Sequence, residues 1–293
     1  MKIQTSHIVL LLLALLATGC LKEDLSACHS SFRLLFSYKG DGQEEIFQQK
    51  IQNVHLYVFD ADNRFIHNET ITPAALAVSP AATLDLPAGK YRIVSVGNYC
   101  DKTVVAGLTE DQVCHLESVL LGHPCAFNGG EITGNDSLYM AITDVEIPPT
   151  GTTADTARFA ASHYDLYVEV RGVDAGETSL NLKQPYQHIN FTNSPCGEAC
   201  CYRPECKISG AGHTTLISRI NVPRFSATDP VTLEVVDGDG NIIHTVDVRQ
   251  FIANARIDLS KQEVLLPILI EFKSIGVTVS VPEWAGQIIQ PEF

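Results

Sequence analysis

Basic residues are scarce in this sequence. It has 20 Lys and Arg side chains against 34 Asp and Glu side chains, which gives a formal net charge of −14 at pH 7. A surface of that charge repels the phosphates of nucleic acid, and no basic cluster interrupts it. The composition therefore argues against a nucleic-acid partner.

The motifs of common catalytic and metal sites are missing as well. The ten His residues form no H-E-x-x-H motif, and the sequence contains neither G-x-S-x-G nor a glycine-rich phosphate loop. Residues 237–241 begin like an EF-hand loop, but Ile242 and Val248 stand where that loop requires Gly and Glu. This segment predicts a hairpin turn, and we expect no catalytic residue, no metal and no cofactor.

The N-terminus has the three parts of a secretory signal. Lys2 provides the positive charge, an uncharged apolar run covers residues 8–17, and small residues precede Cys20. A membrane-spanning helix needs about 20 apolar residues, so this run is too short to serve as one. We expect residues 1–19 to be a signal peptide that is removed.

Cys20 resembles the lipidated cysteine of bacterial lipoproteins, which carries a diacylglyceryl group and an N-acyl chain such as palmitate. Two or more chains hold a protein stably on a bilayer, because each buried CH₂ contributes about 0.8 kcal/mol. The alternative is ordinary secretion with Cys20 left free. Lys22, Glu23 and Asp24 look like the surface-export tag of Bacteroidota lipoproteins, although they also suit a solvated linker. Residues 20–31 are therefore predicted to be a lipidated tether on the cell surface.

Eight further cysteines indicate disulfide bonds, since an even number in an exported chain suits an oxidising space. Cys200 and Cys201 are adjacent, and a bridge between them would be strained, so we expect them to pair outward with Cys196 and Cys206. The alternative, a zinc site, fits the C-x₃-C-C-x₄-C spacing less well. Four candidates precede residue 150 and four follow it, which predicts separate bridges in each half: Cys28, Cys100, Cys114 and Cys125, then Cys196, Cys200, Cys201 and Cys206.

Alternation of apolar and polar residues predicts an all-β chain. Phe32, Leu34 and Phe36 alternate with polar neighbours, while residues 54–59 are apolar on both faces, as in an interior strand. One-sided strands bury their faces against a second sheet, which implies two consecutive β-sandwiches. The proline and threonine stretch at 148–153 places the boundary between residues 32–150 and residues 151–293.

One short helical insertion is expected in the first half. Thr109 and Gln112 have capping-box spacing, apolar residues between 113 and 120 share a helical face, and Gly122 can close the C-terminus. We therefore predict a helix over residues 109–122.

Four segments together resemble the FimB-like anchor subunits of Bacteroidales fimbriae, also called type V pili. They are residues 20–28 (CLKEDLSAC), 53–60 (NVHLYVFD), 86–91 (LPAGKY) and the 237–241 turn. The resemblance implies two transthyretin-like sandwiches, with the lipid end in the outer membrane and the protein end holding the first stalk pilin at the fimbrium base. Stalk pilins of this kind lose their first strand, which a neighbour's strand replaces, whereas an anchor keeps its own. Residues 196–206 depart from the family pattern.

The C-terminus contains candidates for a strand donated to such a pilin. A donor strand is apolar at alternate positions, because one set of side chains fills pockets while the backbone extends the partner's sheet. For the first part of the segment, the alternative is a permanent last strand of the second domain. The candidates are Ile275, Val277, Val279, Val281, Ile288, Ile289 and Phe293.

A surface glycan-binding lipoprotein is the leading alternative function. Two sandwiches on a lipid tether suit glycan capture, but such a surface needs exposed aromatic platforms, and Trp284 is the only tryptophan. An extracellular hydrolase would need a cleft of titratable groups for which the sequence gives no sign.

Overall fold

The computed structural model describes residues 31–285, except 110, 111, 185, 211 and 213. The predicted signal peptide and the tether up to residue 30 lie outside this range. So do residues 286–293. None of the helices in the described part is long and apolar enough to cross a membrane.

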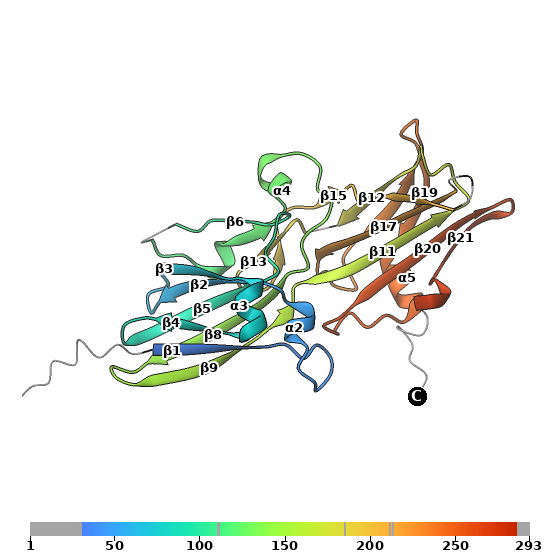
Figure 1. Cartoon of the computed structure of the whole chain (residues 1–293). Coiled ribbons are helices and arrows are strands. Elements are labelled where there is room, and N and C mark those ends of the chain that lie inside the picture. Colours follow the sequence, from blue (N-terminus) through green and yellow to red (C-terminus); the bar gives the residue numbers. More distant parts are fainter. Residues whose placement is uncertain (1–30, 110–111, 185, 211, 213, 286–293) are drawn as a thin grey trace, which may run out of the picture.

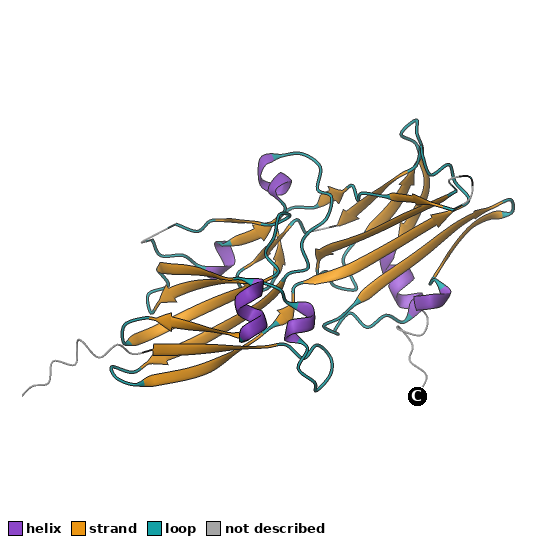
Figure 2. Ribbon diagram, in the orientation of Figure 1, coloured by secondary structure: helices purple, strands orange, loops and turns teal. Residues whose placement is uncertain are grey.

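Two β-sandwiches follow each other along the chain, which confirms the expected all-β fold (Figures 1 and 2). In the first sandwich, a three-stranded sheet of order β4-β1-β9 faces a five-stranded sheet of order β10-β8-β5-β2-β3. The strands are β1 (Ser31–Ser37), β2 (Val54–Asp60), β3 (Phe65–Ile71), β4 (Ala81–Asp85), β5 (Gly89–Gly97), β8 (Tyr139–Ile147), β9 (Thr152–Arg158) and β10 (Ala160–Ala161).

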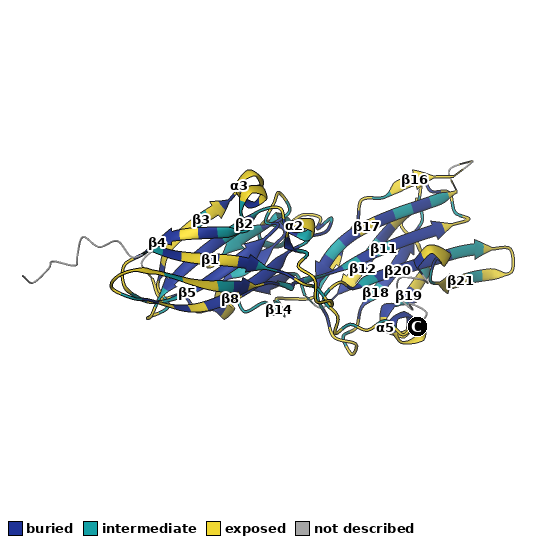
Figure 3. Cartoon of the chain, turned by 60° about the horizontal axis from the view of Figure 1, so that its bottom comes forward, coloured by how far each residue is buried: buried dark blue, intermediate teal, exposed yellow. Residues whose placement is uncertain are grey.

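The alternation that predicted strand β1 determines its buried face. Phe32, Leu34 and Phe36 point into the core between the two sheets, whereas Arg33 and Leu35 are exposed. Strand β2 is buried on both faces, as its apolar sequence predicted. Figure 3 shows these buried strands enclosed by more exposed edges and loops.

A small third sheet of order β14-β13-β7-β6 covers the other face of the five-stranded sheet. Its strands are β6 (Val104–Ala106), β7 (Leu120–Gly122), β13 (His188–Asn190) and β14 (Pro195–Cys196). Tyr57 and Phe59 from β2 pack there against Leu121 and Phe191, within one buried cluster. Residues 188–196 therefore return from the second half of the chain to complete the first sandwich.

The predicted helix over residues 109–122 is wrong. Its described part contains only the short 3₁₀ helix η2 (Leu116–Ser118), followed by strand β7. Val119 and Leu121 are buried at a spacing of two, and β7 pairs with β6 and β13. Tertiary pairing thus overrides the local helical pattern.

The α-helices in the described part of the chain are α2 (Phe47–Lys50), α3 (Pro73–Val78), α4 (Pro124–Asn128) and α5 (Val248–Ala255).

The second sandwich packs a five-stranded sheet of order β16-β17-β11-β20-β21 against a four-stranded sheet of order β15-β12-β18-β19. Its strands are β11 (His163–Arg171), β12 (Ser179–Gln184), β15 (Cys200–Tyr202), β16 (Lys207–Ser209), β17 (Thr215–Pro223), β18 (Thr232–Val236), β19 (Ile242–Asp247), β20 (Leu265–Lys273) and β21 (Gly276–Ser280). The hairpin at 237–241 is confirmed, because it joins paired strands β18 and β19. Asp237 Oδ1 closes the turn by accepting from the backbone N–H groups of Asp239 and Asn241 at 3.0 and 2.8 Å.

The expected boundary at residues 150 and 151 needs correction. Strand β9 lies beyond it and pairs in parallel with β1, and β10 pairs with β8. Residues 148–151 are a turn between β8 and β9, in which Gly151 has φ +94°. The strand pairing passes to the second sandwich only between Ala161 and His163.

The sandwiches lie end to end in an elongated molecule (Figure 1). Strand β1 starts at the outer end of the first sandwich and runs toward the second. The β20–β21 hairpin projects at the opposite end. The point where the chain enters the fold and this hairpin are therefore far apart along the long axis.

Candidate functional site

Strand β1 occupies the centre of its three-stranded sheet. It pairs antiparallel with β4 from Ser31 to Leu35 and parallel with β9 from Ser31 to Ser37. Phe32, Leu34 and Phe36 are almost fully buried, and burying side chains of this size contributes roughly 1.5–3 kcal/mol each. This position is filled by the chain's own first strand, so an added strand has no place in it.

Strand β21 contains two of the predicted donor residues, Val277 and Val279, and Ile275 and Val281 flank it. It pairs antiparallel with β20 at the end of the sheet. Val277 packs against the core, whereas Ile275 at the hairpin tip is 94% exposed. This arrangement favours the alternative that the segment is the last strand of its own domain. Ile288, Ile289 and Phe293 lie outside the described residues.

The chain leaves strand β21 through a turn that is held on the outer face of the sheet. The Trp284 ring packs edge to face on Tyr167 with centroids 5.0 Å apart, and Ala285 is fully buried. The Ala285 N–H donates to the carbonyl oxygen of Pro282 at 2.9 Å. Residue 285 is therefore a fixed point from which the C-terminal segment starts.

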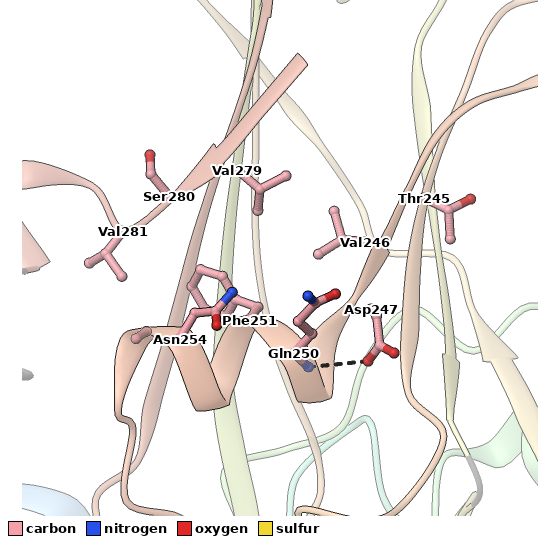
Figure 4. A pocket seen from close by; sticks show the side chains of 10 residues that line it. Thr245, Val246, Asp247, Gln250, Phe251, Asn254, Val279, Ser280 and Val281 are labelled. Carbon is pink, nitrogen blue, oxygen red and sulfur yellow. Dashed lines mark hydrogen bonds between the residues drawn. The ribbon is translucent and has the colours of Figure 1, made fainter. Parts of the chain in front are cut away.

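A groove of about 320 Å³ lies between strands β19 and β21, which end their respective sheets in the described part of the chain. Helix α5 closes one side of it (Figure 4). The lining residues are Thr245, Val246, Asp247, Gln250, Phe251, Asn254, Ala255, Val279, Ser280 and Val281. Two sheet edges above an apolar floor provide the backbone groups and pockets that an extended peptide segment uses.

Helix α5 was not expected from the sequence, although its N-terminus carries a recognisable signal. Asp247 Oδ1 accepts from the backbone N–H groups of Arg249 and Gln250 at 3.0 and 3.2 Å, which makes Asp247 the N-cap. Phe251 and Ile252 then turn toward the core. An aspartate followed by apolar residues at helical spacing indicates a helix start, and that signal could have located the groove.

The predicted disulfide pairing stays a prediction. The seven cysteines in the described residues are all free, and Cys28 lies outside that range. Cys196 belongs to β14 of the first sandwich, whereas Cys200 and Cys201 belong to β15 of the second. The predicted short loops would therefore have to connect two different sheets. Cys125, which the sequence groups with the first half, packs against the second core.

The thiols of the cysteine-rich segment are not arranged as metal ligands. Within the described ranges, no group of three or more His, Cys, Asp or Glu side chains is placed to hold a metal ion. Burial raises the pKa of Cys200 to about 12 and the pKa of Cys206 to about 11. These two side chains are therefore protonated at neutral pH and act as small core residues.

Comparison with known proteins supports a shared fold with fimbrial proteins. The anchor protein Mfa2 from Porphyromonas gingivalis is similar with a TM-score of 0.66 and 15% identity, over 86% of this chain and 95% of that chain. A candidate adhesin from Bacteroides ovatus gives a TM-score of 0.72 and 16% identity, over 87% of this chain and 95% of that chain. Another from Bacteroides thetaiotaomicron gives 0.68 and 14%, over 88% and 98%.

The family assignment comes from the sequence itself. No curated protein matches the chain. The profile of the family described as fimbrillin-A associated anchor proteins Mfa1 and Mfa2 matches residues 25–289, which include both sandwiches. The family is one of fimbrial anchor proteins, in agreement with the resemblance seen in the sequence. This chain belongs to the fimbrillin-A associated anchor protein family.

Proposed function

We propose that this chain is the non-catalytic anchoring subunit that tethers a fimbrium to the outer membrane, as a lipoprotein exposed on the cell surface. The observation that carries the proposal is the position of β1. This strand begins at the end of the proposed tether at residues 20–31 and is hydrogen-bonded on both sides in the centre of its sheet. A subunit that keeps its first strand and its tether is suited to the base of a fibre.

The elongated shape supports a division of roles between the two ends. Strand β1 begins at the outer end of the first sandwich, and the second sandwich lies away from this point (Figure 1). A lipid on Cys20 would hold the first end at the membrane. The second sandwich is then free to bind a fimbrial stalk pilin.

For the contact with this pilin, we propose donation of the segment after residue 285. Strand β21 is already hydrogen-bonded within its own sheet, which leaves Ile288, Ile289 and Phe293 as the donor side chains. Ala285 fixes the start of the segment on the second sandwich. The groove beside α5 is lined in part by residues 279–281, which lead to the turn that ends at Ala285. A pilin held by the donated segment would therefore lie against this groove.

Replacement of the lipidated cysteine tests the anchoring. Cys20→Ala removes the acylation site, and Cys28→Ala in the adjacent segment is the matched control. We expect the Cys20 variant to leave the membrane fraction together with its fimbriae, because acyl chains supply the proposed membrane affinity. The control is expected to remain membrane-bound with fimbriae attached. A Cys20 variant that stays tightly membrane-bound would contradict the proposed tether.

A further inference from the structure

A carboxylate of the second sandwich is bound by side chains of the first. Glu263, just before β20, accepts hydrogen bonds from the hydroxyl groups of Tyr38 at 2.5 Å and Tyr139 at 3.2 Å. It also forms an ion pair with Lys50. All three donors belong to the first sandwich or its loops, so this one side chain crosses the junction.

The backbone beside Glu263 donates hydrogen bonds to the first sandwich. Asp41, in a loop of the first sandwich, accepts from the backbone N–H groups of Gln262 at 2.8 Å and Glu263 at 3.1 Å. The Gln262 side chain accepts from the N–H of Ala161 at 2.9 Å. Residues 262 and 263 are therefore fixed to the first sandwich through both side chains and backbone.

The junction has a polar character that makes these contacts important. The main cores of the two sandwiches are separate clusters. A cavity of about 540 Å³ lies beside Glu263 and is lined by both sandwiches, including His163 and Arg219. Directional hydrogen bonds and an ion pair therefore join the two sandwiches at this place.

Tyr38 connects this cluster to the first strand, since it is the residue directly after β1. It is 1% exposed, and its ring packs against Tyr139 with centroids 4.8 Å apart. Its N–H donates to Glu45 at 2.7 Å, and its carbonyl oxygen accepts from the N–H of Ile46 at 2.8 Å. The hydroxyl group that reaches Glu263 is thus rigidly attached to the end of β1.

The pKa of Glu263 depends on the hydrogen bonds that it receives from the first sandwich. Burial opposes the charge on Glu263, but hydrogen bonds from Lys50 and Tyr38 outweigh burial and hold the pKa of this carboxyl below its usual range. The Glu263 side chain is 30% exposed, yet losing a hydrogen bond to a charged group costs more than losing one between neutral groups. Displacing β1 would withdraw Tyr38 and leave Glu263 with only Tyr139 and Lys50 as partners, so the second sandwich resists that displacement.

We propose that Glu263 is an interdomain latch, which locks the retained first strand in place from the second sandwich. The proposal goes beyond membrane anchoring. It rests on the proposed function in one respect, because tension on the lipidated tether would reach β1 first. While the hydrogen bonds of Glu263 are intact, tension on β1 is transmitted to both sandwiches together.

Hydrogen exchange on the full chain tests the latch. Tyr38→Phe removes one hydroxyl group, and Glu263→Gln removes the charge. Glu234→Gln is the control, because Glu234 also pairs with a lysine, Lys183 at 2.5 Å, but does so within the second sandwich. We expect amides of residues 31–37 to exchange about tenfold faster or more in both latch variants, and at the wild-type rate in the control.

The double variant shows whether the two groups act together. If they form one latch, combining Tyr38→Phe with Glu263→Gln accelerates exchange of β1 no further than the more severe single change. Unchanged exchange in both single variants, or equal acceleration in the Glu234 control, would overturn the proposal. If Glu263→Gln does not fold, Tyr38→Phe alone decides. Because exchange is measured on purified protein, the result is independent of whether fimbriae are retained.

Discussion

Two adjacent leucines in β1 allow a sharp test of how firmly this strand belongs to the fold. Leu34 is fully buried in the first core, whereas Leu35 points outward and is 39% exposed. Both side chains have the same size and lie in the same hydrogen-bonded strand. Replacing each leucine with Ala therefore compares the loss of a buried side chain with the loss of an exposed one in the same strand.

The expected loss of stability follows from the surroundings of Leu34. A buried Leu→Ala change costs about 2–5 kcal/mol, depending on how far the cavity can collapse. Since β1 is held by ladders on both sides, the backbone cannot move inward, and we expect about 3–5 kcal/mol for Leu34→Ala. Leu35→Ala is expected to cost less than about 1 kcal/mol.

Urea denaturation followed by circular dichroism measures this difference on the full chain. The same variants in cells report on function, because a loosened β1 is expected to shed fimbriae into the medium. Equal stability losses for both variants would refute the inward orientation of Leu34. A large loss for Leu34→Ala with full retention of fimbriae would refute the link between β1 and anchoring.

Four further predictions concern other parts of the molecule. Deleting residues 286–293 is expected to release fimbriae while the protein stays on the surface, and surface labelling together with fimbria counts would show whether attachment survives. Although burial opposes the charge of Glu263, hydrogen bonds from Lys50 lower its pKa, so its contribution to stability is present above about pH 4.3 and is lost as the pH falls through the folded value. Acid titration of unfolding should therefore show a steeper loss in the wild type than in Glu263→Gln. Gly172→Ala should destabilise the protein by more than about 1 kcal/mol in thermal denaturation, since φ is +80° and a Cβ would lie 2.3 Å from the carbonyl oxygen of Phe272. Exposed Cys100 should react faster with a thiol reagent than Cys200, whose pKa burial raises to about 12, and mass spectrometry of the labelled native protein would reveal the reverse order if it occurred.

Local patterns predicted those strands that have a single buried face. The alternation at Phe32 and Leu34, the doubly apolar β2 and the Asp237 turn all depend on neighbours close in sequence. Such segments satisfy their hydrogen bonds and bury their side chains in the way their own periodicity suggests. The all-β class and both sandwiches could therefore be read directly.

Long-range pairing explains what the sequence did not reveal. The predicted linker at 148–153 runs into strand β9, which extends the first sheet because its backbone pairs with β1. Residues 120–122 become a strand because β6 and β13 lie beside them. The Glu263 cluster joins segments far apart in the chain, so local periodicity contained no sign of it, and the groove beside α5 was indicated only by the helix start at Asp247.

The return of β13 and β14 to the first sandwich affects how the chain is built during synthesis. The ribosome completes the boundary at residue 162 well before it reaches residue 196, and until then the outer face of β2 and β5 lacks Ile189 and Phe191. Contacts of such large sequence separation form slowly. The first sandwich is therefore completed only after residue 196 has been synthesised, and until then the nascent chain exposes an apolar surface that is prone to aggregation.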